Sequence, residues 1–176
     1  AMQFFWAPFR DNPLGEPKGD GSGFVTVDRT VATGGEDVSF GVAALGVEGD
    51  TVASVRLPYE PVAGTDEVLA RSIQELRTFR GDPPDPSAAE RVLRDNGLIP
   101  LYLPPVTALS VGQDGSIWLR REAIAADSTL WTVLDANAQV EGAVYLPRGD
   151  SVIAARGDML ATVAHDELDV PSVAIY

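Results

Sequence analysis

The sequence predicts a mainly β fold, and three observations support the prediction. Short runs rich in Val, Thr and aromatic residues recur along most of the chain, with turn residues between them. Asp-Gly or Gly-Asp pairs separate two such runs at residues 114–115 and 157–158, which is the pattern of a tight β-hairpin. The motif V-x-L-P occurs twice, at residues 55–58 and 144–147. The chain is therefore predicted to repeat one hairpin-based unit.

The composition argues against several classes of function. The chain has 176 residues, of which 45% are hydrophobic and 22% are charged, as in a globular protein. Its net charge of -13 repels phosphate backbones and anionic lipid, so we expect neither a nucleic-acid partner nor a membrane partner. The absence of Cys excludes thiolate catalysis, disulfides and Cys-bound zinc. No cofactor is expected.

Residues 3–58 are expected to form the first group of four strands. The aromatic run at residues 3–9 is predicted as its first strand, and the Gly-, Pro- and Asp-rich residues 10–23 as a loop. Three further strand-length segments follow, at residues 24–32, 37–45 and 51–58. The last of them ends in Pro, which cannot donate a hydrogen bond to a further strand, so it is predicted to be the last of its sheet.

Residues 59–105 interrupt the strand pattern. Apolar residues at helical spacing predict a helix over residues 65–80. A second helix is predicted over residues 85–97, because Asp85 and Gly97 suit its two ends. We interpret this segment as a short helical insertion that packs an apolar face on the β domain, because an isolated helix of this length is marginal in water.

The strand pattern resumes in residues 106–147 and continues in residues 151–176. Seven further strands are expected, four in the first of these groups and three in the second. Units of about 45 residues with four short strands are typical of β-propeller blades. The predicted fold is one partial propeller domain over residues 1–176. It has about three four-stranded antiparallel blades, half of a six-bladed ring, with the last blade incomplete and a short helical insertion.

The second half of the chain resembles a known family. The segments "DGSIWLRRE", "LWTVLDANAQVEGAVYLP" and "RGDMLATVAHDELDVPSVAIY" are similar to the C-terminal blades of bacterial six-bladed β-propeller proteins of the NHL-like group. The turn at residues 135–138 lacks the Gly that is usual there, and His165 stands where Arg is common. The resemblance implies a propeller fold and a periplasmic or extracellular location, which the residues themselves leave open. It implies little about chemistry, because propellers carry unrelated functions.

Four residues are candidates for ligand binding: Arg121, His165, Asp166 and Glu167. His165 is the single histidine, and with the carboxylates beside it, it could act as a general base or join a metal site, or it could belong to a solvated hairpin loop. Arg121 could bind an anionic ligand or form a contact between blades. No metal site is predicted, because the strands expected to line the propeller channel carry no carboxylate.

Two classes of function remain open. One is a non-catalytic propeller module that binds a protein or a small ligand, and the other is a lactonase-like or hydrolase-like enzyme with its site at the channel mouth. The missing channel carboxylates and the single histidine favour the first.

A homodimer is expected from the number of blades. Three blades cannot close a ring, and a half-ring should leave apolar residues of its inner strands facing solvent along its open sides: Leu109, Val111, Val152 and Ile153. Two chains would complete six blades, and the last blade could take its missing strand from residues 3–9 of the partner.

Overall fold

The computed structural model describes residues 13–29, 38–62, 102–121, 128–147, 149–157, 159–165 and 170–176. The chain divides into two units, and the unit made of Asn12–Tyr59 and Pro105–Tyr176 holds all the strands described below. The two predicted helices and the predicted strand at residues 3–9 lie outside the described residues. The described part of the chain contains no helix long and apolar enough to cross a membrane.

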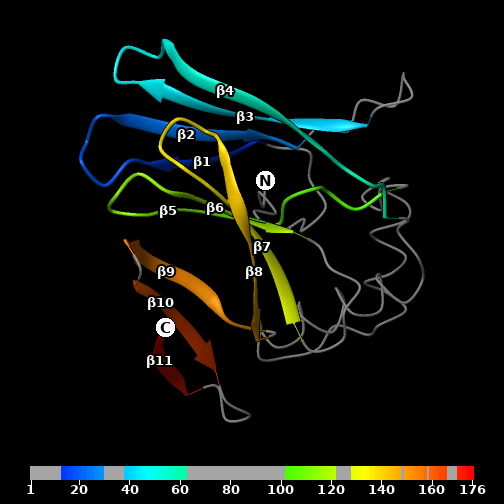
Figure 1. The fold of residues 1–176 in the computed structure, drawn as a ribbon, viewed down its shortest axis with the longest axis vertical. Helices are drawn as coiled ribbons and strands as arrows, with labels where there is room; N and C mark the ends of the chain where they lie inside the picture. The colour runs from blue at the N-terminus through cyan, green and yellow to red at the C-terminus, as the bar shows by residue number, and fades with distance from the viewer. Residues whose placement is uncertain are drawn as a thin grey trace, which may run out of the picture. The chain divides into compact units, whose positions relative to one another are not determined.

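The first sheet has four antiparallel strands in chain order. They are β1 (Leu14–Pro17), β2 (Gly23–Asp28), β3 (Ser39–Gly46) and β4 (Thr51–Pro58) (Figure 1). The prediction of a loop over residues 10–23 is wrong at β1. This strand has no β-branched residue, but each of its residues pairs with a residue of β2. Pairing with a neighbour, and not intrinsic propensity, therefore makes it a strand.

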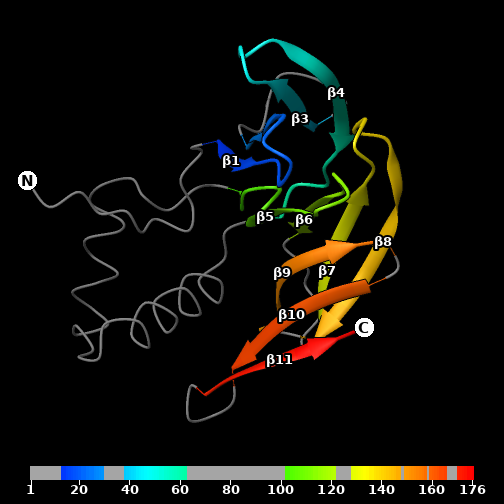
Figure 2. The same cartoon turned by 90° about the vertical axis from the view of Figure 1, so that its left-hand side faces the viewer.

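Two more antiparallel sheets follow. The central sheet contains β5 (Ala108–Val111), β6 (Ile117–Arg121), β7 (Ser128–Leu134) and β8 (Val140–Pro147). The last sheet contains β9 (Ser151–Arg156), β10 (Met159–His165) and β11 (Pro171–Ile175), which run side by side (Figure 2). The prediction of a mainly β fold made of antiparallel sheets is confirmed. The two V-x-L-P segments end β4 and β8, which are edge strands of their sheets as predicted.

The backbone of the first sheet is repeated in the central sheet. The β3–β4 and β7–β8 hairpins both carry a register shift just before the turn. Their five-residue turns, 46–50 and 135–139, are closed by backbone hydrogen bonds at equivalent positions. The fourth residue of each turn has a positive φ, 84° at Gly49 and 61° at Ala138. The second hairpins of the two sheets thus have the same backbone arrangement.

The hydrophobic core lies between neighbouring sheets, and the central sheet contributes to it from both faces. One cluster joins the first and central sheets and includes Val25, Val27, Phe40, Val42, Leu109, Ile117, Leu119 and Leu134. The other joins the central and last sheets and includes Trp131, Leu146, Val152, Ala155 and Leu160. The first strands of the sheets are neighbours, with β1 beside β5 and β5 beside β9 (Figures 1 and 2).

Packing between sheets corrects one prediction. Leu109 and Val152 were expected to face solvent, but each is buried in a cluster between two sheets. Val111 is half-buried against the same core. Only Ile153 is exposed as expected. The physical reason is that the neighbouring sheets of the same chain already cover the inner strands.

Candidate binding site at the hairpin turns

The first hairpin turns of the first and central sheets contain the same tripeptide, Asp-Gly-Ser. In each turn Oδ1 of the Asp accepts a hydrogen bond from the backbone amide of the Ser, at 2.9 Å from Ser22 to Asp20 and at 3.0 Å from Ser116 to Asp114. The Gly between them has a φ of 74° in the first turn and 84° in the second, a conformation that favours glycine. The sequence therefore builds the same Asp-Gly-Ser bend twice, although the first turn closes one residue later, with Lys18 donating to Gly23, than the second, where Gly112 donates to Ser116.

The turn of the central sheet is also bonded to the turn of the last sheet. Oδ2 of Asp114 accepts a hydrogen bond from the amide of Gly157, in the β9–β10 turn, at 2.7 Å. Its Oδ1 accepts a second bond from the Ser116 hydroxyl at 2.6 Å. The amide of Gln113 donates to the carbonyl oxygen of Ala155 at 2.9 Å. These bonds fix the position of the central-sheet turn relative to the last sheet.

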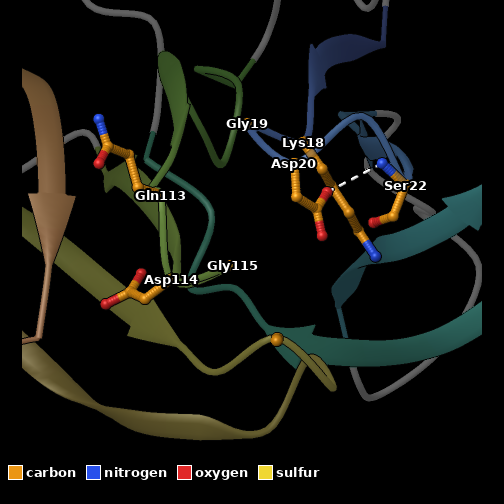
Figure 3. Close-up of a pocket in the computed structure, with 9 residues that line it drawn as sticks. Lys18, Gly19, Asp20, Ser22, Gln113, Asp114 and Gly115 are labelled. Carbon is orange, nitrogen blue, oxygen red and sulfur yellow. Dashed lines mark hydrogen bonds between the residues drawn. The ribbon is translucent and has the colours of Figure 1, made fainter.

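A small cavity of about 120 Å³ lies between the first-hairpin turns of the first and central sheets (Figure 3). It is lined by Lys18, Gly19, Asp20, Ser22, Gly112, Gln113, Asp114, Gly115 and Ala136. Figure 3 shows the carboxylate of Asp20 directed into the space between the turns, whereas that of Asp114 points away from Asp20. Pockets for drug-sized ligands measure roughly 300–1,000 Å³. This cavity therefore suits a single amino-acid side chain.

The carboxylates of the cavity are ionised at neutral pH. The backbone hydrogen bond from Ser22 lowers the pKa of Asp20 below its ordinary value. Burial raises the pKa of Asp114, but the hydrogen bonds from Ser116 and Gly157 outweigh that effect and hold this pKa below its ordinary value. Asp20 and Lys18 therefore line the cavity with opposite charges, and the Asp114 carboxylate, which points away from Asp20, adds a second negative charge nearby. The balance of charge favours a cationic ligand group.

The chemistry available at the cavity is ionic contact and hydrogen bonding. Its side chains offer carboxylate, ammonium, hydroxyl and amide groups. Among the described residues there is no group of three or more His, Asp or Glu side chains that could hold a metal ion. The arrangement fits recognition of a charged or polar group.

The structure places Arg121 at the contact between the first and central sheets. Its guanidinium carbon lies 4.8 Å from the centroid of the Phe40 ring, and Nη2 donates to the carbonyl oxygen of Pro58 at 3.3 Å. Partial burial lowers the pKa of Arg121, whereas the charge on Tyr59 raises it. Of the two alternatives for this residue, the geometry matches the contact between sheets. A role in ligand binding stays a prediction.

The other predicted ligand-binding residues lie at the end of the last sheet. His165 is the final residue of β10. Asp166 and Glu167 fall outside the described residues. Arg121 and His165 therefore belong to different sheets, and a shared site for these four residues stays a prediction.

Sequence reasoning did not find the cavity between the turns. The signal was present, because Asp-Gly-Ser occurs at both residues 20–22 and 114–116. The first copy lies in the segment predicted as a loop, so it was not recognised as the counterpart of the second. Two equal turns at the ends of repeated hairpins would have predicted that the turns lie at the same end of neighbouring sheets.

Comparison of the chain with protein-family models, with curated proteins and with solved structures finds no match. The resemblance to NHL-like six-bladed propellers therefore stays a prediction.

Proposed function

We propose that the chain is a non-catalytic β-propeller module, half of a six-bladed ring, that binds a protein partner. The observation that carries the proposal is the order of the first strands, because β1 lies beside β5 and β5 beside β9. Propeller blades have this order, with successive sheets packed face to face and their innermost strands next to one another. The repeated hairpin geometry of the first two sheets supports the same interpretation.

The turns of the first hairpins offer the best-defined binding surface. Hydrogen bonds within each turn fix its shape before a partner arrives, and a further bond ties the central-sheet turn to the last sheet. A preformed surface loses little conformational entropy on binding. The cavity between them has the volume of one side chain, and its surroundings carry two carboxylates, Asp20 in the lining and Asp114 turned away from it, against the one ammonium group of Lys18. A Lys or Arg side chain of a protein partner fits both properties.

Binding at the turns can be tested with capped amino acids as probes. We expect N-acetyl-arginine amide, titrated into isotope-labelled protein, to shift the backbone amide resonances of residues 19–22 and 113–116. N-acetyl-glutamate amide should leave them unchanged, because the lining is negative. Asp20→Asn should weaken the arginine response, whereas Glu48→Gln, at the exposed β3–β4 turn, should preserve it. Equal responses to the two probes, or shifts confined to other residues, would refute a cation-binding surface here.

A separate assay addresses the enzyme alternative. The protein should show no turnover of a panel of lactones and esters, with or without added calcium. Turnover that disappears in His165→Ala would contradict a non-catalytic module. The result is independent of the probe titration, because His165 ends β10 in the last sheet, whereas the residues that line the cavity come from the turns of the first and central sheets.

A further inference from the structure

The last sheet buries one face and exposes the other. The strand pairs Ala161↔Ile175 and Val163↔Val173 place these side chains on the same face. Val173 is 63% exposed and Ile175 is 74% exposed. Leu160 belongs to the opposite face and is buried against the central sheet. We call the exposed side, with Val163, Val173 and Ile175, the free face of the last sheet.

The first sheet also has a free face, and the equivalent face of the central sheet is buried against a neighbouring sheet. Leu45 and Leu134 each follow the register shift of their hairpin, so they are counterparts in the two copies of the repeat. Leu45 pairs with Phe24, as Leu134 pairs with Ile117. In the central sheet this pair is fully buried against a neighbouring sheet, whereas Phe24 is 50% exposed. The side with Phe24 and Leu45 is the free face of the first sheet.

We propose that these two free faces bind each other between two copies of the chain. The inference rests on the proposed propeller arrangement and names its partner as a second copy. Within one chain, the face of the first sheet that carries Val25 packs on the face of the central sheet that carries Ile117. The other face of the central sheet, which carries Trp131, packs on the face of the last sheet that carries Leu160. Among the described strands, one face of each kind is left without a neighbouring sheet: the free face of the first sheet and the free face of the last sheet. Two copies related by a two-fold axis would satisfy both faces of both chains and form a closed assembly.

Charge sets the conditions for this association. Each chain carries a net charge of -13, so two copies repel each other at long range. Salt screens that repulsion, with a Debye length of about 30 Å at 0.01 M and about 3 Å at 1 M. The contacts of Phe24, Val173 and Ile175 are apolar and are not weakened by screening. Association should therefore become tighter as the salt concentration rises.

The oligomeric state of the full chain tests the inference. Light scattering after size exclusion should give twice the single-chain mass of 18.7 kDa, with a larger dimer fraction at high salt. Phe24→Asp and Val173→Asp should each give the single-chain mass with an unchanged circular dichroism spectrum, because both side chains are exposed in the single chain. The matched control is Val140→Asp, which changes an exposed valine of β8 outside both free faces and should keep the dimer.

Mixing the two variants identifies which faces meet. A mixture of Phe24→Asp and Val173→Asp chains should recover dimers, because the intact last sheet of the first variant can bind the intact first sheet of the second. If Phe24→Asp stays dimeric while Val173→Asp dissociates, like faces pair and the inference is wrong. A wild-type monomer that still binds the arginine probe would overturn the pairing of copies and leave the proposed binding function standing.

Discussion

Replacing Arg121 with Met should destabilise the protein by weakening the contact between the first and central sheets. The guanidinium group lies over the Phe40 ring, with 4.8 Å between its carbon and the ring centroid. It also donates to the carbonyl oxygen of Pro58 at 3.3 Å. Met keeps much of the apolar stem of Arg but has neither the charge nor the donors. The substitution therefore removes both interactions with little loss of volume.

The expected cost is about 2 kcal/mol. A cation–π contact contributes about 0.5–1 kcal/mol at an exposed site and about 2 kcal/mol when desolvated, and Arg121 is half-buried. A hydrogen bond from a charged donor contributes about 1.5–3 kcal/mol, and the long distance at Pro58 places this bond at the lower end. Part of the sum is lost to solvent screening at the exposed side of the guanidinium group.

Urea denaturation at neutral pH measures this cost as a shift of the midpoint at constant slope. Arg56→Met is the matched control, because Arg56 bonds Ser39 in an exposed position and should cost well under about 1 kcal/mol. A double-mutant cycle of Arg121→Met with Phe40→Leu should show a coupling energy of about 1 kcal/mol. Strict additivity, or equal costs at Arg121 and Arg56, would show that Arg121 does not join the sheets.

Substitutions at three further positions test the core and the turns. Asp150→Ala should destabilise the last sheet by about 1–3 kcal/mol in thermal denaturation, because it leaves the buried Thr162 hydroxyl without its acceptor at 2.9 Å; an unchanged melting temperature would contradict this. Trp131→Phe should cost less than about 1.5 kcal/mol by urea denaturation, because the indole N–H that it removes is buried without a hydrogen-bond partner. Trp131→Ala, which also empties the space of the ring, should cost about 3–5 kcal/mol. Similar costs for the two variants would show that the N–H has a hydrogen-bond partner. Asp114 has its pKa lowered on folding from 3.8, so its contribution to stability is complete above that pH and is lost as the pH falls through the folded-state pKa. Asp114→Asn should therefore flatten the acid side of the stability curve, and an unchanged slope between pH 4 and pH 2 would refute the assignment.

The strands that could be predicted from the sequence are those whose own residues specify them. β2, β6 and β7 combine β-branched or aromatic residues with alternating burial, and Pro ends β4 and β8. The exception is β1, Leu14–Pro17, which contains Gly and Pro and no β-branched residue. It is a strand because β2 provides a partner for each residue. Contact with a neighbour is a tertiary property that local propensity does not contain.

Burial and the candidate site were harder to predict than the strands. Alternation along a strand separates its two faces, but it does not say which face another sheet will cover. The assignment of Leu109 and Val152 to solvent was wrong for this reason. The cavity depends on two turns that are 94 residues apart at Asp20 and Asp114, and only their contact in space makes it visible. The predicted helices, together with Asp166 and Glu167, lie outside the described residues.

The turn between β7 and β8 explains why the repeat is faint in the sequence. Ala138 adopts a φ of 61°, which costs a residue with a side chain roughly 1–2 kcal/mol compared with glycine. Its methyl group is fully buried in the core, which returns roughly 0.8 kcal/mol. Burial therefore offsets part of the conformational cost at Ala138, whereas a methyl group added at Gly49 would meet nothing within 4 Å and gain no such compensation. The two turns therefore keep the same backbone with different amino acids, and for this reason the repeat is faint in the sequence.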